Sequence, residues 1–348
     1  MITQIKKGIT PIKRILVVRT DRIGEVLLTT PILTALKEAL PEAKVSMMVK
    51  PEVKELVEDN PCVSEIIEYG EGKIGEDKGG EGKIRGNKGT VGKVRGKKGW
   101  IRKAFRLKNI LKERNFDAVI IVNPKKEFHL AAFLAGIPVR VGFDRKWGFL
   151  LTHKVKDLKC LAQKHEIEYN LDLVRALGIE PHSIKPVLYI KEECPISAPG
   201  GEPLIAIHPC TSNPKKQWPR HSFAKLADML ARGGNSIVWV SGPDEAAQSR
   251  RGAVSLMKGR SIDLSGKTSL KGLAALLKKC RFLVSGDSGP VHIAAAVGTP
   301  VVAIFGTSDP GSNPTRWGPY GAGHIVIQKD RLEDITPEEV YEAIAHKL

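Results

Sequence analysis

The chain has 348 residues, 42% of them hydrophobic, and a formal net charge of +17 at pH 7. This length suffices for two domains of ordinary size, each with its own buried core. The sequence has no apolar run of about 18 residues, which argues against a membrane-spanning helix, and its five cysteines form no C-x-x-C pair, which argues against a zinc knuckle or a disulfide framework.

The first segment, MITQIKKGITPIKRILVV, contains basic residues but neither a long apolar stretch nor a small-residue cleavage site. We therefore expect no signal peptide and a reduced, cytosolic protein. The charge excess predicts an anionic partner, such as nucleic acid, a phosphorylated lipid or a phosphate-bearing substrate.

The first half alternates short Val- and Ile-rich runs with helical patterns, which is typical of a doubly wound parallel sheet. Strands are predicted near 14–19, 44–49, 63–69, 117–123 and 139–143. Helices are predicted near 24–39, 52–58, 101–114 and 127–136. We expect this first domain to span residues 1–185.

A decapeptide repeat interrupts this half at about residues 70–100, reading EGKIGEDKGG, EGKIRGNKGT and VGKVRGKKGW. Its Gly and Lys content and its few apolar residues predict a weakly ordered loop. Between Glu71 and Lys108, thirteen Lys and Arg outnumber four Asp and Glu, so this stretch carries +9 of the net charge. The insert is either an electrostatic arm for an anionic surface or a duplicated, solvated loop.

A helix is predicted near 165–178, and the Pro- and Gly-rich segment CPISAPGGEP at 194–203 is typical of a domain boundary. The strand pattern then restarts at 204–209, 236–242, 261–264, 281–287 and 301–306. Helices are predicted at 221–232, 244–257, 269–279 and 289–298, and a last helix begins with Thr336 as N-cap and Pro337 at its first position. We expect a second domain over 186–348, and hence an α/β protein of two Rossmann-like, doubly wound domains that face a cleft.

Polar residues follow the strands of the second domain. In SGDSGPVHIAAAVG, the backbone N–H groups of Ser288 and Gly289 are expected at a helix N-terminus, which suits an anion. Asp287 either contacts a ligand or caps the helix; FGTSDP, a second polar turn at the same edge, favours a ligand. Asp244 and Glu245 follow another strand, where acids either bind a ribose hydroxyl or cap a helix.

Two further stretches carry candidate groups. In HPCTSNPKKQW, Thr211 and Ser212 offer hydroxyls, while Lys215 and Lys216 either bind a phosphate or belong to a solvated basic loop. In RTDRIGEVLLTTPIL, residues 19–33, a strand runs through charged residues and one glycine into Glu25 at the start of a helix. Glu25 is either a helix N-terminal charge or a general base.

Five motifs in this order resemble the heptosyltransferase family, bacterial enzymes that build the inner core of lipopolysaccharide. They are RTDRIGEVLLTTP (19–31), RVGFDRKWGFLLTH (140–153), KQWP (216–219), GDSGPVHIAAAVGTPVVAIFG (286–306) and RWGPYG (316–321). The resemblance implies a GT-B glycosyltransferase fold and an inverting transfer of heptose from ADP-heptose to a Kdo or heptose acceptor. The first domain would bind the acceptor and the second the donor.

The resemblance also assigns residues. The general base falls on Glu25, where the family usually has aspartate, and the lysine that holds the pyrophosphate falls on Lys216. The implied donor-binding set is Thr211, Ser212, Lys216, Asp244, Asp287, Ser288, Gly289 and His292, although His292 alternatively packs within its apolar helix. The candidate acceptor-binding residues are Asp21, Arg22, Arg140, Arg145 and Lys146.

Glutamate in place of aspartate moves the carboxylate by on the order of an ångström, a displacement to which catalysis is sensitive. Three interpretations follow: Glu25 is still the base, Asp21 takes the proton instead, or transferase activity is lost. Because the sequence contains no D-x-D, we expect neither metal nor cofactor, with Lys216 and a helix dipole stabilising the departing diphosphate.

Two broader alternatives stay open. The chain is a transferase of the same fold with another nucleotide-diphosphate sugar, or a non-catalytic protein that binds anionic glycolipid or nucleic acid. Nucleic acid is disfavoured, because aromatic residues do not interleave with the basic run. Charge and family together predict a cytoplasmic protein, peripheral on the inner face of the cytoplasmic membrane, where a Kdo-lipid A acceptor is anionic and membrane-held.

Overall fold

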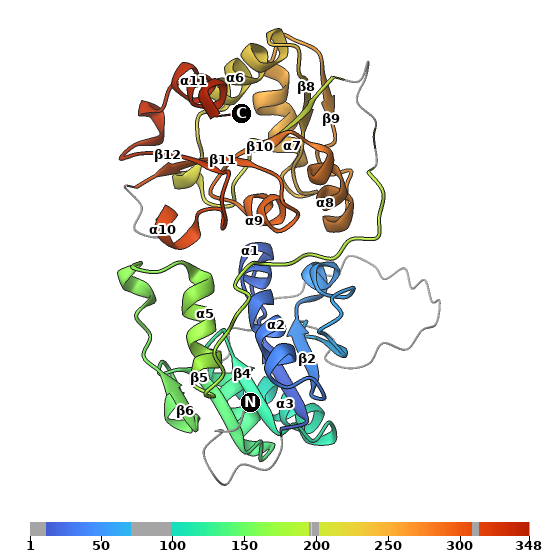
Figure 1. The fold of residues 1–348 in the computed structure, drawn as a ribbon, viewed down its shortest axis with the longest axis vertical. Helices are drawn as coiled ribbons and strands as arrows, with labels where there is room; N and C mark the ends of the chain where they lie inside the picture. Colours follow the sequence, from blue (N-terminus) through green and yellow to red (C-terminus); the bar gives the residue numbers. More distant parts are fainter. Residues whose placement is uncertain (1–11, 71–98, 195, 197–201, 308–312, 348) are drawn as a thin grey trace.

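The computed structural model describes residues 12–70, 99–194, 196, 202–307 and 313–347. Two α/β domains lie one above the other, and a single chain segment joins them along one side (Figure 1). Residues 71–98 of the predicted repeat and most of the predicted boundary at 194–203 lie outside the described residues. The domain limits at 185 and 186 stay a prediction.

The first domain is built on a six-stranded parallel sheet of order β3-β2-β1-β4-β5-β6. Its strands are β1 (Arg14–Val18), β2 (Lys44–Val49), β3 (Glu65–Glu68), β4 (Ala118–Ile121), β5 (Val139–Phe143) and β6 (His153–Val155). The predicted strands are confirmed, and β6 was missed. This edge strand is three residues long and only half-buried, so its sequence lacks the apolar run that marks a central strand.

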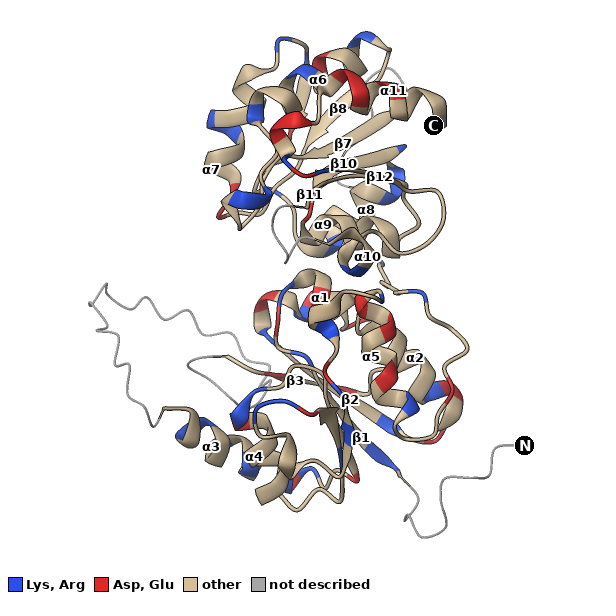
Figure 2. Cartoon of the chain, turned by 90° about the vertical axis from the view of Figure 1, so that its left-hand side faces the viewer, with Lys and Arg blue, Asp and Glu red and all other residues tan. Residues whose placement is uncertain are grey.

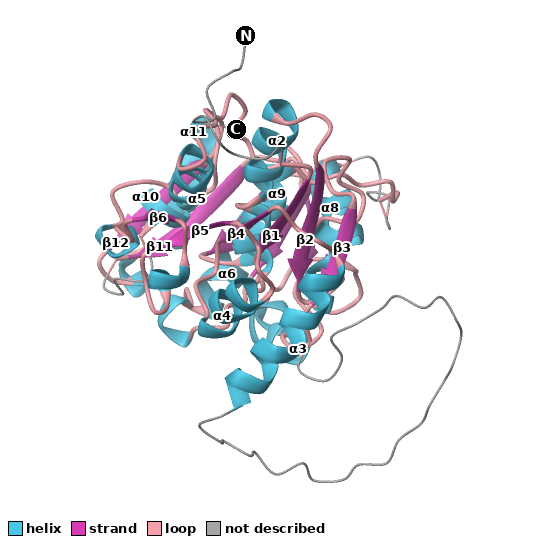
Figure 3. Ribbon diagram, turned by 90° about the horizontal axis from the view of Figure 1, so that it is seen from below, coloured by secondary structure: helices cyan, strands magenta, loops and turns pink. Residues whose placement is uncertain are grey.

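Helices cover both faces of this sheet (Figure 3). One face carries α2 (Thr30–Ala39) and α5 (Glu166–Arg175), and the other carries α3 (Gly99–Glu113) and α4 (Lys126–Leu134). Side chains alternate along β1, so that Ile15 and Val17 join the first core and Leu16 and Val18 the second. Short 3₁₀ turns complete the domain, namely η1 (Pro51–Leu56), η2 (Gly148–Leu150) and η3 (Lys159–Leu161).

The single helix predicted over 24–39 is wrong, because the chain breaks it into α1 (Ile23–Leu27) and α2. The Thr29 hydroxyl donates to the carbonyl of Glu25 at 2.8 Å, and the Thr30 hydroxyl donates to the carbonyl of Leu27 at 2.8 Å. Threonine hydroxyls that compete for helical carbonyls, followed by Pro31, end one helix and begin another. Glu25 therefore lies in a five-residue helix.

The second domain repeats the topology, with the strand order β12-β11-β10-β7-β8-β9. Its strands are β7 (Leu204–His208), β8 (Ser236–Trp239), β9 (Ser261–Asp263), β10 (Phe282–Gly286), β11 (Val301–Gly306) and β12 (Ile325–Lys329). The edge strand β12 was also missed. In both sheets the chain reverses its direction of strand addition at the first strand, which places a binding crevice at the carboxyl ends of β1 and β4 and of β7 and β10.

Helices again cover both faces of the second sheet. One face carries α6 (Arg220–Arg232) and α11 (Pro337–Lys347), and the other carries α8 (Leu270–Lys279) and α9 (Gly289–Ala296). The predicted cap of α11 is confirmed, since Thr336 Oγ1 accepts from the Glu339 N–H at 3.2 Å. The helix predicted near 244–257 is not one regular α-helix, because α7 (Ala246–Ser249) gives way to the π-helical segment η6 (Arg250–Val254), in which Gly252 leaves the helical region.

The two domains meet where α1 packs against α9, in the centre of the interface (Figure 1). Glycines permit this close approach. A Cβ atom on Gly24 would lie 2.5 Å from the ring of His292, and one on Gly289 would lie 3.0 Å from Ile23.

Polar contacts join the domains on either side of this centre. Glu55 of η1 accepts hydrogen bonds from the N–H groups of Leu270 (3.0 Å) and Lys271 (3.3 Å) at the start of α8. On the other side, Glu166 of α5 pairs with Arg316 of α10 (Pro314–Trp317) at 2.8 Å. The packing of α1 against α9 and the polar contacts on its two sides therefore fix how the carboxyl edges of the two sheets face each other.

Candidate active site

A cleft of about 1180 Å³ lies between the carboxyl edges of the two sheets. Most of the predicted site residues line it, namely Asp21, Arg22, Glu25, Thr211, Ser212, Lys216, Asp244, Asp287, Ser288, Gly289 and His292. The fold thus brings together residues that are more than 260 positions apart in the sequence. Their individual roles stay predictions.

The three remaining candidates, Arg140, Arg145 and Lys146, are not among the described residues that line the cleft. The Arg140 guanidinium donates to the carbonyls of Leu150 (2.8 Å) and Ile137 (2.5 Å), and it therefore ties η2 to the sheet. Arg145 forms an ion pair with Asp157 at 3.4 Å. A contact of these cations with an acceptor stays a prediction.

The second domain supplies an anion-binding arrangement. Lys216 Nζ lies 2.5 Å from the Asp287 carboxylate, and both side chains are mostly buried. Asp287 directly precedes Ser288, the N-cap residue of α9, whose side chain makes no capping hydrogen bond. The first N–H groups of α9 and the Lys216 ammonium therefore converge on the cleft, where together they suit a phosphate.

The local sequence fixes the position of Lys216. Asn213 begins the 3₁₀ turn η5 (Pro214–Lys216), since its side chain accepts from the Lys215 N–H at 3.1 Å. Just beyond the turn, Trp218 is fully buried and donates to the carbonyl of Ile335 at 3.0 Å. The lysine is held between a capped turn and a buried anchor.

A chain of hydrogen bonds crosses the end of the second sheet. Glu245 contacts His208 Nε2 at 3.3 Å, His208 Nδ1 contacts the Ser285 hydroxyl at 3.2 Å, and Ser285 contacts the Ser288 hydroxyl at 2.8 Å. The hydrogen bond from His208 holds the pKa of Glu245 below its usual value. This chain links the loop after β8 to the start of α9.

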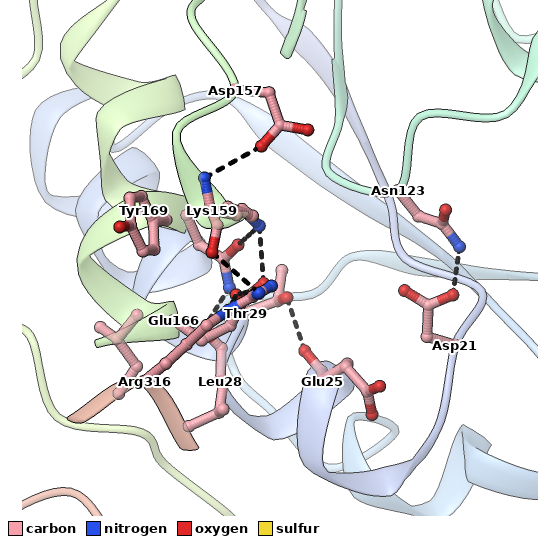
Figure 4. A network of polar contacts seen from close by, with 12 residues as sticks. Asp21, Glu25, Leu28, Thr29, Asn123, Asp157, Lys159, Glu166, Tyr169 and Arg316 are labelled. Carbon is pink, nitrogen blue, oxygen red and sulfur yellow. Dashed lines mark hydrogen bonds and ion pairs between the residues drawn. The ribbon is translucent and has the colours of Figure 1, made fainter. Parts of the chain in front are cut away.

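Two of the carboxylates that the first domain places in the cleft, Asp21 and Glu25, have different surroundings. Asp21 pairs with Arg19 at 3.0 Å and accepts a hydrogen bond from the Asn123 amide. The Glu25 carboxylate has no ion pair or hydrogen bond among the described residues, and Figure 4 shows it turned away from the surrounding polar network. Of the two, Glu25 is the carboxylate whose oxygens are open to a substrate.

A buried charge cluster lies behind these carboxylates (Figure 4). Glu166 is 1% exposed and contacts Lys159 at 2.6 Å, Arg316 at 2.8 Å and Arg19 at 3.6 Å. Burial alone would raise the pKa of Glu166, but the three cations lower it below the usual value. Burial lowers the pKa of Lys159 to about 8 despite the attraction of Glu166. Arg19 bridges this cluster to Asp21.

His292 occupies a different environment from the other candidates. Its side chain is buried beside Gly24, and burial lowers its pKa to about 3, so the ring is neutral at physiological pH. Within the described chain its Nδ1 has no hydrogen-bond partner. The ring lines the inner wall of the cleft and packs the two domains together.

Several lining residues were missed from the sequence, namely Lys50, Glu52, Glu55, His208 and Ser269. Lys50 directly follows β2, and His208 is the last residue of β7. A polar residue at the carboxyl end of a buried parallel strand is a signal of a binding site that is visible in the sequence. No comparable signal marks Glu55, whose role depends on a contact across domains.

Within the described residues, no group of three or more His, Cys, Asp or Glu side chains is placed to hold a metal ion. Among the helices in the described ranges, none has the length and apolar character that crossing a membrane requires.

Comparison with known proteins identifies relatives along most of the chain. It is 26% identical to lipopolysaccharide heptosyltransferase 2 of Salmonella typhimurium, over 95% of this chain and 97% of that protein. It is also 26% identical to lipopolysaccharide heptosyltransferase 3 of Escherichia coli, over 82% of this chain and 80% of that protein.

Solved structures show the same two-domain GT-B architecture. ADP-heptose lipopolysaccharide heptosyltransferase II of Escherichia coli superposes with a TM-score of 0.76 at 23% identity, covering 96% of this chain and 98% of that one. An Escherichia coli heptosyltransferase solved with ADP-2-deoxy-2-fluoro heptose has a TM-score of 0.70 at 22% identity, covering 96% and 100%. The family model described as glycosyltransferase family 9 (heptosyltransferase) matches residues 104–344. The chain therefore belongs to glycosyltransferase family 9, the heptosyltransferases, and is a transferase.

Proposed function

We propose that this enzyme transfers a heptose from ADP-heptose to the Kdo or heptose residues of the lipopolysaccharide inner core. The names of its relatives support the acceptor class, and the heptose analogue in a solved neighbour supports the donor class. One observation carries the chemistry: the Glu25 carboxylate, which has no ion pair among the described residues, and a cationic phosphate site at Lys216 and α9 line one cleft from opposite domains.

The proposed reaction is a single inverting displacement without a metal. A Glu25 oxygen takes the proton of an acceptor hydroxyl, and that oxygen attacks the anomeric carbon as the bond to the diphosphate breaks. The leaving diphosphate gains negative charge, which Lys216 and the N–H groups at Ser288 and Gly289 stabilise. Asp287 holds the Lys216 ammonium in place until the donor binds.

Asp21 is the weaker candidate for the base. Its carboxylate already neutralises Arg19 and accepts from Asn123. Taking a proton there would weaken both contacts and leave the Arg19 guanidinium, whose side chain is only 4% exposed, with one anionic partner fewer. We therefore assign Asp21 and Arg22 to orienting the acceptor.

The test is ADP release from ADP-heptose, with and without Kdo-lipid A. We expect acceptor-dependent release by the wild type, a 10²–10⁴-fold loss of kcat in Glu25→Gln, and partial recovery in Glu25→Asp. ADP affinity should be the same in all three proteins, since Glu25 is in the other domain from the phosphate site. Full activity in Glu25→Gln would move the base elsewhere, and Asp21→Asn would be examined next.

Absence of release by a wild type that still binds ADP would refute heptose as the donor sugar and direct the assay to other ADP- and UDP-sugars. We further propose that the enzyme associates peripherally with the inner face of the cytoplasmic membrane, because its acceptor is lipid-held and the chain is strongly cationic. Recovery of the protein in the soluble fraction at low salt would contradict this association.

A further inference from the structure

The first domain exposes a group of aromatic side chains on one flank. Phe149 is 66% exposed and Phe133 is 48% exposed. The Trp147 ring lies 5.6 Å from Phe149 on one side and 5.0 Å from Trp100 on the other. We call these four residues the aromatic ridge. Single apolar residues scattered over a surface are ordinary and need no explanation. Several aromatic rings gathered at one place on the surface, in contrast, mark an interaction site.

Cations accompany each part of the ridge. Lys126 Nζ lies 5.9 Å from the centre of the Trp100 ring, and the Arg140 guanidinium lies 5.6 Å from Phe133. Arg102 and Arg106 are exposed on α3, next to an exposed Phe105 (54%). Figure 2 shows Lys and Arg along α3 and at the start of α4. Aromatic rings beside Lys and Arg match the boundary between lipid tails and anionic head groups.

The topology places one end of the ridge, at Trp100 and Trp147, near the acceptor side of the cleft, whereas Phe133 lies at the far end of α4, beside Arg140. Lys126 begins α4, the helix that follows the carboxyl end of β4, and Trp147 and Phe149 lie in the segment that follows β5. The same sheet edge lines the cleft. Lys125, the neighbour of Lys126, reaches the Thr20 hydroxyl at 3.2 Å, next to Asp21. A lipid held against the ridge would thus present its head group near the first domain's cleft wall.

We propose that the aromatic ridge and its cations seat the enzyme on an anionic lipid bilayer, with the rings at the level of the head groups. The reason for such a surface rests on the proposed function, a transfer to a lipid-held acceptor, but lipid binding itself does not depend on catalysis. We identify the partner as a bilayer because aromatic rings and cations lie together on one flank of the first domain. The positive charge of this flank complements anionic lipid head groups. Partition should fall about tenfold for each lost ring and about fivefold for each lost cation.

The experiment measures partition of the full chain onto vesicles of phosphatidylcholine, with or without about one third phosphatidylglycerol. The variants are Phe133→Ser with Phe149→Ser, and Lys126→Glu. Matched controls in the second domain are Leu256→Ser, which is 52% exposed, and the exposed Lys278→Glu. All substituted positions are exposed, so thermal unfolding should show an unchanged fold in each variant.

We expect the wild type and both controls to bind anionic vesicles, and the ridge variants to bind far less. At about 0.5 M salt, where exposed charges are screened, the residual binding should fall in Phe133→Ser with Phe149→Ser but should no longer depend on Lys126. Transfer to an acceptor in vesicles should fall with partition, whereas transfer to a deacylated, soluble acceptor should not change.

Absence of wild-type binding, or equal binding of wild type and ridge variants, would overturn the proposal. Equal loss in the matched controls would also overturn it, because the effect would then be one of overall charge or polarity. A wild type that binds vesicles but transfers no heptose to either acceptor would refute the proposed function and leave the surface intact.

Discussion

His292 should make the stability of this enzyme fall steeply in mild acid. The buried ring has a pKa of about 3, whereas the same histidine in the unfolded chain has its ordinary value of 6.5. Below pH 6.5 the unfolded chain therefore binds a proton that the folded chain does not. The stability that this histidine contributes is complete above pH 6.5 and is lost as the pH falls towards 3, amounting to about 2 kcal/mol lost at pH 5.

His292→Leu isolates this contribution. Leucine takes up no proton, and no hydrogen bond is lost at Nδ1, since that atom has no partner among the described residues. Urea unfolding at pH 7 and pH 5 should show the wild type losing about 2 kcal/mol more than His292→Leu over that interval. The exposed His182→Leu serves as the control and should follow the wild type. An equal pH dependence in wild type and His292→Leu would refute the reasoning, since the ring would then titrate freely in the folded protein.

Three further predictions concern the domain interface. Gly24→Ala puts a Cβ atom 2.5 Å from the His292 ring, so the two domains should move apart. Solution scattering should then show a larger radius of gyration, and kcat/KM should be at least about tenfold lower. An unchanged radius of gyration would contradict this prediction. Glu166→Gln removes the anion that pairs with the buried Lys159 and with Arg316, so the free energy of unfolding measured by urea titration should fall by about 3–5 kcal/mol. Arg316→Gln, at the more exposed partner, should lower the free energy of unfolding by less. Lys159 has a pKa of about 8 when folded and 10.5 when unfolded, so the unfolded chain keeps its proton to higher pH and stability rises between these values. From pH 7 to 10 the wild type should gain about 2–3 kcal/mol over Lys159→Met, and parallel curves would refute this.

Much of the fold could be predicted from the sequence, because buried parallel strands consist of short Val- and Ile-rich runs. The central strands β1 and β10 have this form and were placed within one or two residues. The edge strands β6 and β12 are half-exposed, so their composition does not distinguish them from loops. The break between α1 and α2 depends on which carbonyls Thr29 and Thr30 reach, and hydroxyl contacts of this kind are not visible in an apolar pattern.

The candidate site divides in the same way. Residues that directly follow a strand, such as Asp287, were identified because parallel topology puts all carboxyl ends at one edge. The cationic character of Arg140 suggested an acceptor contact, but its guanidinium donates to two backbone carbonyls near β5. The pairing of Glu166 with Arg316 joins positions 150 residues apart on different domains. Nothing in the local sequence around either residue indicates its partner, so only the folded chain could show this ion pair.

The division of the cleft between two domains also bears on whether water can hydrolyse a bound sugar nucleotide. In the proposed mechanism, a donor held at Lys216 and α9 lies beside Asp287, whose carboxylate is paired with Lys216. The proposed base, Glu25, lies in the opposite domain, across the contact of Gly24 with His292. In the proposed mechanism, Glu25 therefore activates a nucleophile at the donor, including a water molecule, only when the two domains are in contact. The domain interface would thereby limit hydrolysis of the sugar nucleotide.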